Sequence, residues 1–197
     1  SNDRIHWKPF EGEGKAVSLD PLTPFEDPDK QYNSDTHLVY RKDIDTLECY
    51  WRQVDNRTRI DKIMKRTTTD GIHWSKAQNV LVSDARTDRI LSPAIIYENG
   101  RYKMWTVNCK RKFPVLYRES KDGFHWTTPS TIQLKYPSDR LRSWHLDVIH
   151  TEKGYEMLVV AFYKGHMHRE MNLYYTSSKN EHDFKKCITI LKPSEKE

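Results

Sequence analysis

Aspartate and histidine recur at one fixed spacing in this 197-residue chain, and that pair of residue types can carry acid–base chemistry. Three heptapeptides, residues 1–7, 68–74 and 120–126, share the order hydroxyl, any residue, Asp, usually Gly, apolar, His, Trp. Residues 178–184 form a degenerate fourth copy. A catalytic role for His73 and His125 is the less favoured interpretation. Residues that recur in every unit of a repeat usually serve the unit's structure.

The heptapeptide predicts a tight turn. Asp70-Gly71 and Asp122-Gly123 supply a carboxylate that bonds nearby main-chain amides and a glycine that accepts positive φ. The Trp that follows is then expected to fill an apolar slot as the chain enters the next strand.

The three cysteines, Cys49, Cys109 and Cys187, are far apart and belong to no metal-ligand spacing. We therefore interpret them as free thiols in strands. The sequence predicts no metal site and no cofactor.

Between the turns, short β-type runs follow one another in the same order three times. Asn99-Gly100 is the strongest local hairpin signal in the chain, and no helical period is found. The pattern predicts an all-β propeller of four-stranded antiparallel blades. The expected strands are 36–40, 47–54, 59–67 and 79–83; then 93–97, 100–107, 115–120 and 131–134; then 145–150, 154–163, 171–177 and 185–191.

These units divide the chain into parts of one propeller domain. Residues 1–32 are expected to be the outer strand of a preceding blade and a long loop, and 33–83, 84–135 and 136–197 are expected to be one blade each. Since propellers usually close with about four to eight blades, we expect further blades before residue 1 or closure by oligomerisation.

Composition narrows the function classes. Hydrophobic residues make up 36% of the chain and aromatic residues 12%, which excludes a disordered segment and suits a β-rich core. No apolar run approaches the roughly 20 residues of a membrane span. Nucleic-acid binding has only the net charge of +5 in its favour, with no supporting motif, and is not expected.

Two segments resemble the inner hairpins of a known family. Residues 92–105 (SPAIIYENGRYKMW) and residues 143–148 (SWHLDV) followed by 154–158 (GYEML) are similar to the five-bladed propeller glycosidases, the arabinanase, levansucrase and invertase group. Together with the Asp-Gly-x-His-Trp turns, the resemblance extends from about residue 33 to the end of the chain. It implies a five-bladed propeller fold, with about three blades in this chain, and activity on carbohydrate.

In that group, paired carboxylates at the starts of inner strands converge on the central axis, and one acts as the acid. Alignment of the three inner strands places Asp35, Ser92 and His145 at equivalent positions, and Asp147 on the same face as His145. The resemblance thus implies Asp35 and Asp147 as catalytic candidates and Ser92 and His145 as substrate contacts. Only one of the three equivalent positions is a carboxylate, which departs from the family pattern. Structural carboxylates in a turn or channel are the alternative.

The loops expected on one rim of the propeller are rich in Lys, Arg and His. They are residues 53–59, 84–91, 108–113, 137–144 and 164–170. Such a rim predicts an anionic glycan as ligand, because Arg pairs bidentately with carboxylate and phosphate. A solvated basic rim without a ligand is the alternative. The candidate binding residues are Arg52, Arg111, His166 and Arg169, with Trp144 as a stacking platform and Trp105 more suited to core packing.

Three functions remain in competition. The first is a glycoside hydrolase-like enzyme or a related transferase or phosphorylase. The second is a catalytically inactive propeller that binds glycans, of a cell-surface or phage adhesion kind, and the third is a protein-interaction propeller. Both carbohydrate interpretations are compatible with an extracellular or cell-surface location.

Overall fold

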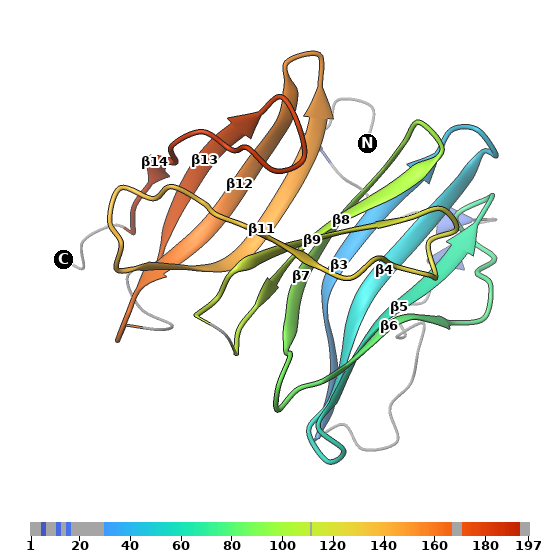
Figure 1. The fold of residues 1–197 in the computed structure, drawn as a ribbon. Helices are drawn as coiled ribbons and strands as arrows, with labels where there is room; N and C mark the ends of the chain where they lie inside the picture. The colour runs from blue at the N-terminus through green and yellow to red at the C-terminus, as the bar shows by residue number, and fades with distance from the viewer. Residues whose placement is uncertain are drawn as a thin grey trace.

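Three four-stranded antiparallel sheets account for most of the described chain (Figure 1). The computed structural model describes residues 5–6, 11–12, 15–16, 30–110, 112–166 and 171–193. A short pair, β1 (Glu11–Gly12) and β2 (Lys15–Ala16), precedes the sheets. The first sheet contains β3 (Gln31–Arg41), β4 (Thr46–Asp55), β5 (Ile60–Thr68) and β6 (Gln78–Asp84). The second contains β7 (Ile90–Glu98), β8 (Arg101–Asn108), β9 (Val115–Ser120) and β10 (Ser130–Ile132). The third contains β11 (Leu141–Thr151), β12 (Gly154–Tyr163), β13 (Asn172–Ser178) and β14 (Ile188–Leu191).

In each sheet the strands pair in chain order, as in a propeller blade, and the all-β propeller prediction is confirmed. Every strand range predicted from the sequence overlaps a strand of the structure. The inner strands β3, β7 and β11 lie side by side, with β7 in the middle (Figure 1).

The Asp-Gly turns form as the sequence predicts. Asp70 Oδ1 accepts main-chain amides of Ile72 and His73 at 2.8 Å each, and His73 Nδ1 lies 2.7 Å from Asp70 Oδ2. These hydrogen bonds hold the pKa of Asp70 well below its ordinary value. The side chain of His73 is 86% exposed and contacts Asp70 of its own turn, which favours a structural role in the turn.

The second copy has the same bonds between Asp122, Phe124 and His125, and Asn180 takes the carboxylate's place in the degenerate copy. Asp3 and Trp7 of the first copy lie outside the described residues.

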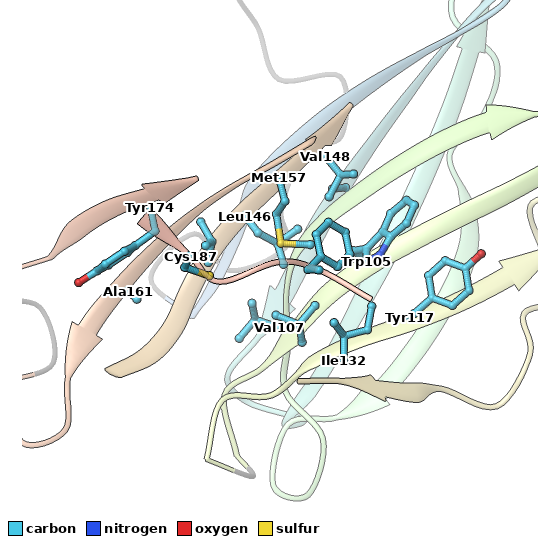
Figure 2. Close-up of a cluster of buried hydrophobic side chains, with 14 of the residues drawn as sticks. Trp105, Val107, Tyr117, Ile132, Leu146, Val148, Met157, Ala161, Tyr174 and Cys187 are labelled. Carbon is cyan, nitrogen blue, oxygen red and sulfur yellow. The ribbon is translucent and has the colours of Figure 1, made fainter. Parts of the chain in front are cut away.

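The largest apolar cluster lies between the second and third sheets (Figure 2). Trp105 is completely buried there, and its indole Nε1 donates to the carbonyl of Glu181 at 3.2 Å, which satisfies its polar edge. Facing side chains from the third sheet include Leu146 and Met157. A smaller cluster, which includes Tyr50 and Met104, joins the first and second sheets. Alternation along each strand supplies these side chains to the sheet faces.

Buried polar clusters join the sheets near the β3–β4 and β7–β8 hairpins. Between the first two sheets, Glu48 Oε1 accepts Lys65 Nζ at 2.7 Å and Tyr102 OH at 2.8 Å. Between the second and third, Lys103 Nζ lies 2.5 Å from Glu98 Oε1 and 2.6 Å from Tyr155 OH. In each cluster a tyrosine of the following sheet meets an acid–lysine pair of the preceding one.

The two end sheets leave large apolar side chains exposed, and β7–β10 leave none. Leu38, Tyr40 and Val82 of the first sheet are more than half exposed, as are Ile149 and Ile188 of the third. That further blades or a second copy of the chain cover these two sheets stays a prediction. The described part of the chain contains no helix that could cross a membrane.

Candidate functional site

Each inner strand carries a β-bulge at the same level, which brings the predicted site residues together. Register shifts occur between Ser34 and His37, between Leu91 and Ala94, and between Ser143 and His145. Asp35 and Ser92 take positive φ values of 54° and 53° at these bulges. A bulge redirects a side chain out of the strand's regular alternation, and bulges are common beside active sites.

The side chain of Asp35 has little exposed surface and is held by a main-chain and a side-chain donor. Its Oδ2 lies 3.1 Å from Arg52 Nε and accepts the main-chain amide of Ser92 at 3.2 Å. The side chains of Asp35 and Arg52 are only 8% and 6% exposed. Ser92 Oγ in turn bonds the main chain of Leu146, donating to its carbonyl and accepting its amide. These contacts fix Asp35 between all three inner strands.

A chain of alternating charges runs from Asp35 to the rim. Arg52 Nη1 donates to the carbonyl of Ile90 at 3.1 Å and lies 4.0 Å from Asp61 Oδ2. Asp61 Oδ2 also accepts Arg89 Nε at 3.1 Å. Arg52 has acidic neighbours on both sides, which compensate the cost of burying its charge. Arg89 lies at the edge of the cleft, with 28% of its side chain exposed.

His145 is the site residue that both contacts Asp35 and reaches solvent. Its Nδ1 lies 3.5 Å from Asp35 Oδ1, and 40% of its side chain is exposed. Burial lowers the pKa of His145, Arg52 lowers it further, and Asp35 opposes the shift. With Nδ1 facing the carboxylate, the neutral imidazole places its proton there and leaves the Nε2 lone pair for proton transfer.

A reciprocal pair lies two residues along both strands. His37 Nδ1 is 3.7 Å from Asp147 Oδ1, and His37 Nε2 bonds the carbonyl of Ile95 at 2.8 Å. Asp147 is 61% exposed, and one of its oxygens accepts the amide of Val148 at 2.9 Å. Strands β3 and β11 thus exchange two His–Asp contacts across β7.

Asp35 and His145 face a cleft of about 500 Å³. Aromatic rings line it together with three basic side chains, Arg52, Arg89 and Lys110. The Phe113 ring lies 6.0 Å from Trp144, centroid to centroid, and Trp144 lies 5.4 Å from His145. The full lining is Tyr32, Ser34, Asp35, Arg52, Arg89, Leu91, Cys109, Lys110, Phe113, Trp144 and His145.

The structure therefore brings Asp35, Arg52, Trp144 and His145 to one cleft, and Ser92 supports it through its amide and hydroxyl. Asp147 does not line this cleft; it borders a smaller hollow of about 200 Å³ on the third sheet.

Of the remaining rim candidates, His166 is exposed in the loop after β12 and does not line the cleft. Arg111 and Arg169 lie outside the described residues. Among the residues that are described, no cluster of three or more His, Cys, Asp or Glu side chains could hold a metal ion.

Sequence reasoning missed several lining residues. The loops that contain Arg89, Lys110 and Phe113 were expected on the basic rim, but no signal singled out these positions. Tyr32 lies at the start of β3, before the predicted strand, so its place beside Asp35 depended on a longer inner strand than the pattern indicated.

Comparison with known proteins defines the fold class. No family model matches the chain, and no curated protein matches it either. Solved structures do match, and since each of them is less than 25% identical to this chain, the likeness shows a shared fold.

One match is an N-acetylgalactosamine deacetylase from F. plautii in complex with blood group B trisaccharide, with a TM-score of 0.81 and 22% identity over 98% of this chain. A GH32 β-fructofuranosidase of Bombyx mori matches with a TM-score of 0.61 and 10% identity over 80% of the chain. An α-L-arabinanase of Penicillium chrysogenum complexed with arabinobiose matches with a TM-score of 0.56 and 14% identity over 74%. This chain spans 61%, 35% and 44% of those three chains, respectively.

Proposed function

We propose that this chain forms the saccharide-binding part of a carbohydrate-active propeller and that His145 is its acid–base residue. The observation that carries the proposal is the cleft of about 500 Å³ in which the Phe113 and Trp144 rings lie beside the Asp35–His145 pair. Aromatic rings suit the apolar faces of sugars, and a few convergent polar groups orient the ligand.

The structural neighbours support a carbohydrate ligand. They include a deacetylase of an amino sugar, a β-fructofuranosidase and an arabinanase, so one fold hosts several chemistries on saccharides. Arg89 and Lys110 add positive charge to the cleft, which favours a saccharide with an acidic group.

In this proposal Asp35 is a positioning residue and not the acid of a paired-carboxylate mechanism. Arg52 and the Ser92 amide occupy one of its oxygens, and its other oxygen faces the imidazole of His145. His145 Nε2 then takes or returns the proton at the sugar. Asp147 remains a second acidic candidate, since it lies on β11 two residues beyond His145.

A glycan panel tested against the protein and its variants separates the outcomes. We expect Trp144→Ala to weaken saccharide binding about tenfold through lost ring contact, which corresponds to about 1.4 kcal/mol. We expect His145→Gln to remove turnover while binding stays within about threefold. His73→Gln, in an exposed turn, is the matched control and should change neither property.

A binding propeller without turnover is the second candidate, favoured because Asp35 is the one carboxylate among the described residues that line the cleft. Saccharide binding without product formation by the protein would support it. If Trp144→Ala and His145→Gln both behave like the control, the cleft is not the site.

A further inference from the structure

A second and larger cleft of about 670 Å³ lies between the second and third sheets. Its walls are the loop before β9, strand β10 with the segment that follows it, and the start of β11. Of the predicted catalytic and substrate-binding residues that the structure describes, none lines it. We propose that this cleft binds further units of the same acidic glycan chain; this inference rests on the proposed function of the first cleft.

The two clefts share a wall. Phe113 lines both of them, and consecutive residues of β11 divide between them, Ser143 in the second and Trp144 and His145 in the first. A chain bound against Trp144 can therefore pass the Phe113 ring into the second cleft.

The backbone at this shared wall is strained and held by packing. Lys112 and Phe113 have φ values of 66° and 58°, a region that costs an L-residue roughly 1–2 kcal/mol. The Phe113 ring contacts Phe162 edge-on at 5.1 Å between centroids and Trp144 at 6.0 Å. Such strain persists where surrounding contacts over-determine it, and it clusters at binding sites. The ring is thus fixed as a ridge between the clefts.

The second cleft is basic. Lys112, Lys135 and Arg142 line it, against one acid, Asp139. Arg142 Nη1 donates at 2.7 Å to the carbonyls of Asp139 and Leu141, which orients the guanidinium. Within the described ranges no carboxylate lies in ion-pair contact with any of these three cations, whereas Arg52, Lys65 and Lys103 each have at least one.

The rest of the lining suits a sugar. Gln133 and Ser138 offer hydrogen-bonding groups, and the half-buried Leu134 and Tyr136 offer apolar surface. Alternating apolar faces and hydroxyl edges characterise a saccharide, and unpaired cations recognise carboxylate or sulfate substituents. The ligand class is therefore an oligosaccharide with an anionic group on successive units.

Calorimetry with size-fractionated oligogalacturonides, from monomer to octamer, tests this. Methyl-esterified oligogalacturonides are the neutral counterpart, and heparin oligosaccharides test sulfate in place of carboxylate. We expect affinity for at least one acidic series to rise tenfold or more between dimer and hexamer. Salt should weaken the binding of the longer chains more than that of the dimer.

Variants then assign the gain to the second cleft. Lys135→Ala/Arg142→Ala should remove the length-dependent gain and leave dimer affinity within twofold. The single variant Lys135→Glu, at an exposed position, leaves Arg142 and its main-chain contacts in place and should have the same effect. Lys76→Ala/Lys179→Ala, which removes two exposed lysines from turns elsewhere, is the charge-matched control and should retain the gain.

The outcomes are distinguishable. A length-dependent gain that survives both the double variant and Lys135→Glu overturns the second cleft and leaves the first intact. Equal gains for esterified and free acids overturn the anionic ligand class. If no saccharide of any series binds, the second cleft and the proposed function fail together.

Discussion

The two ends of the inner strands carry similar types of polar residue. They differ in whether the same residues recur in each sheet and in how far they reach solvent. At the hairpin end, Glu48 with Lys65 and Glu98 with Lys103 form buried clusters of the same chemistry at successive interfaces between sheets. At the cleft end, the equivalent positions are Asp35, Ser92 and His145, a different residue in each sheet.

This difference separates structural polar groups from functional ones. The hairpin-end acids and lysines satisfy one another and the following tyrosine, and they leave little surface for a ligand. At the cleft end, the charges of Asp35 and Arg52 are paired in the interior, while His145 and Lys110 face open space. Buried polar clusters that recur at each interface indicate contacts that join the sheets. Polar residues that differ from sheet to sheet and reach solvent indicate a functional site.

The largest expected effect is at the hairpin end. Glu48→Ala leaves the Lys65 ammonium buried without its partner, since Glu48 is 2% exposed and Lys65 is 4% exposed. We expect a loss of about 3–5 kcal/mol in the free energy of unfolding, measured by urea denaturation. Glu48→Leu combined with Lys65→Met should recover the part that comes from the unpaired ammonium, while the hydroxyls of Tyr50 and Tyr102 still lose their acceptor.

An exposed pair supplies the control for that experiment. Arg86 and Asp84 are in contact at 2.8 Å at the surface, and Arg86→Ala should leave the urea midpoint unchanged within error. A loss below 1 kcal/mol for Glu48→Ala would mean that the buried cluster is not a joint between the sheets.

A smaller effect is expected from two glycines in the corresponding hairpins. Gly154 has a φ of +109°, and an added Cβ would lie 2.2 Å from the carbonyl oxygen of Ser178. Gly100 has a φ of +73° with nothing within 4 Å of such a Cβ. We expect Gly154→Ala to cost about 2–4 kcal/mol and Gly100→Ala about 1 kcal/mol. Equal losses in thermal unfolding would show that the contact with Ser178 does not constrain the hairpin.

These hairpins also show what could be predicted from the sequence. The Asn99-Gly100 turn, the Asp-Gly turns and the strand order follow from local residue preferences, and the structure contains all of them. The close approach of Gly154 to Ser178 depends on how β12 meets the end of β13, which no local pattern encodes.

The site was predictable only in part for the same reason. Alignment of the inner strands brought out Asp35, Ser92 and His145, because a repeat places equivalent positions at one level. The partner of Asp35 could not be found this way, because Arg52 reaches it from β4 across a bulge. The exchange of His–Asp contacts between β3 and β11 also depends on how the sheets pack against each other.

The smallest effect, and the most specific to the cleft end, is on the titration of His145. Because burial and Arg52 lower its pKa, the NMR midpoint of His145 should lie below the ordinary value of about 6.5. Asp35→Asn should lower the midpoint further, because the carboxylate opposes the shift. An acidic oligosaccharide should raise the midpoint, so affinity should increase as the pH falls through it.

Folding favours the neutral imidazole, so His145 protonation slightly destabilises the protein as the pH falls below about 6.5. A midpoint above 6.5 in the free protein, or one that Asp35→Asn leaves unmoved, would mean that the Asp35–His145 contact has no electrostatic consequence and that the cleft end is as structural as the hairpin end.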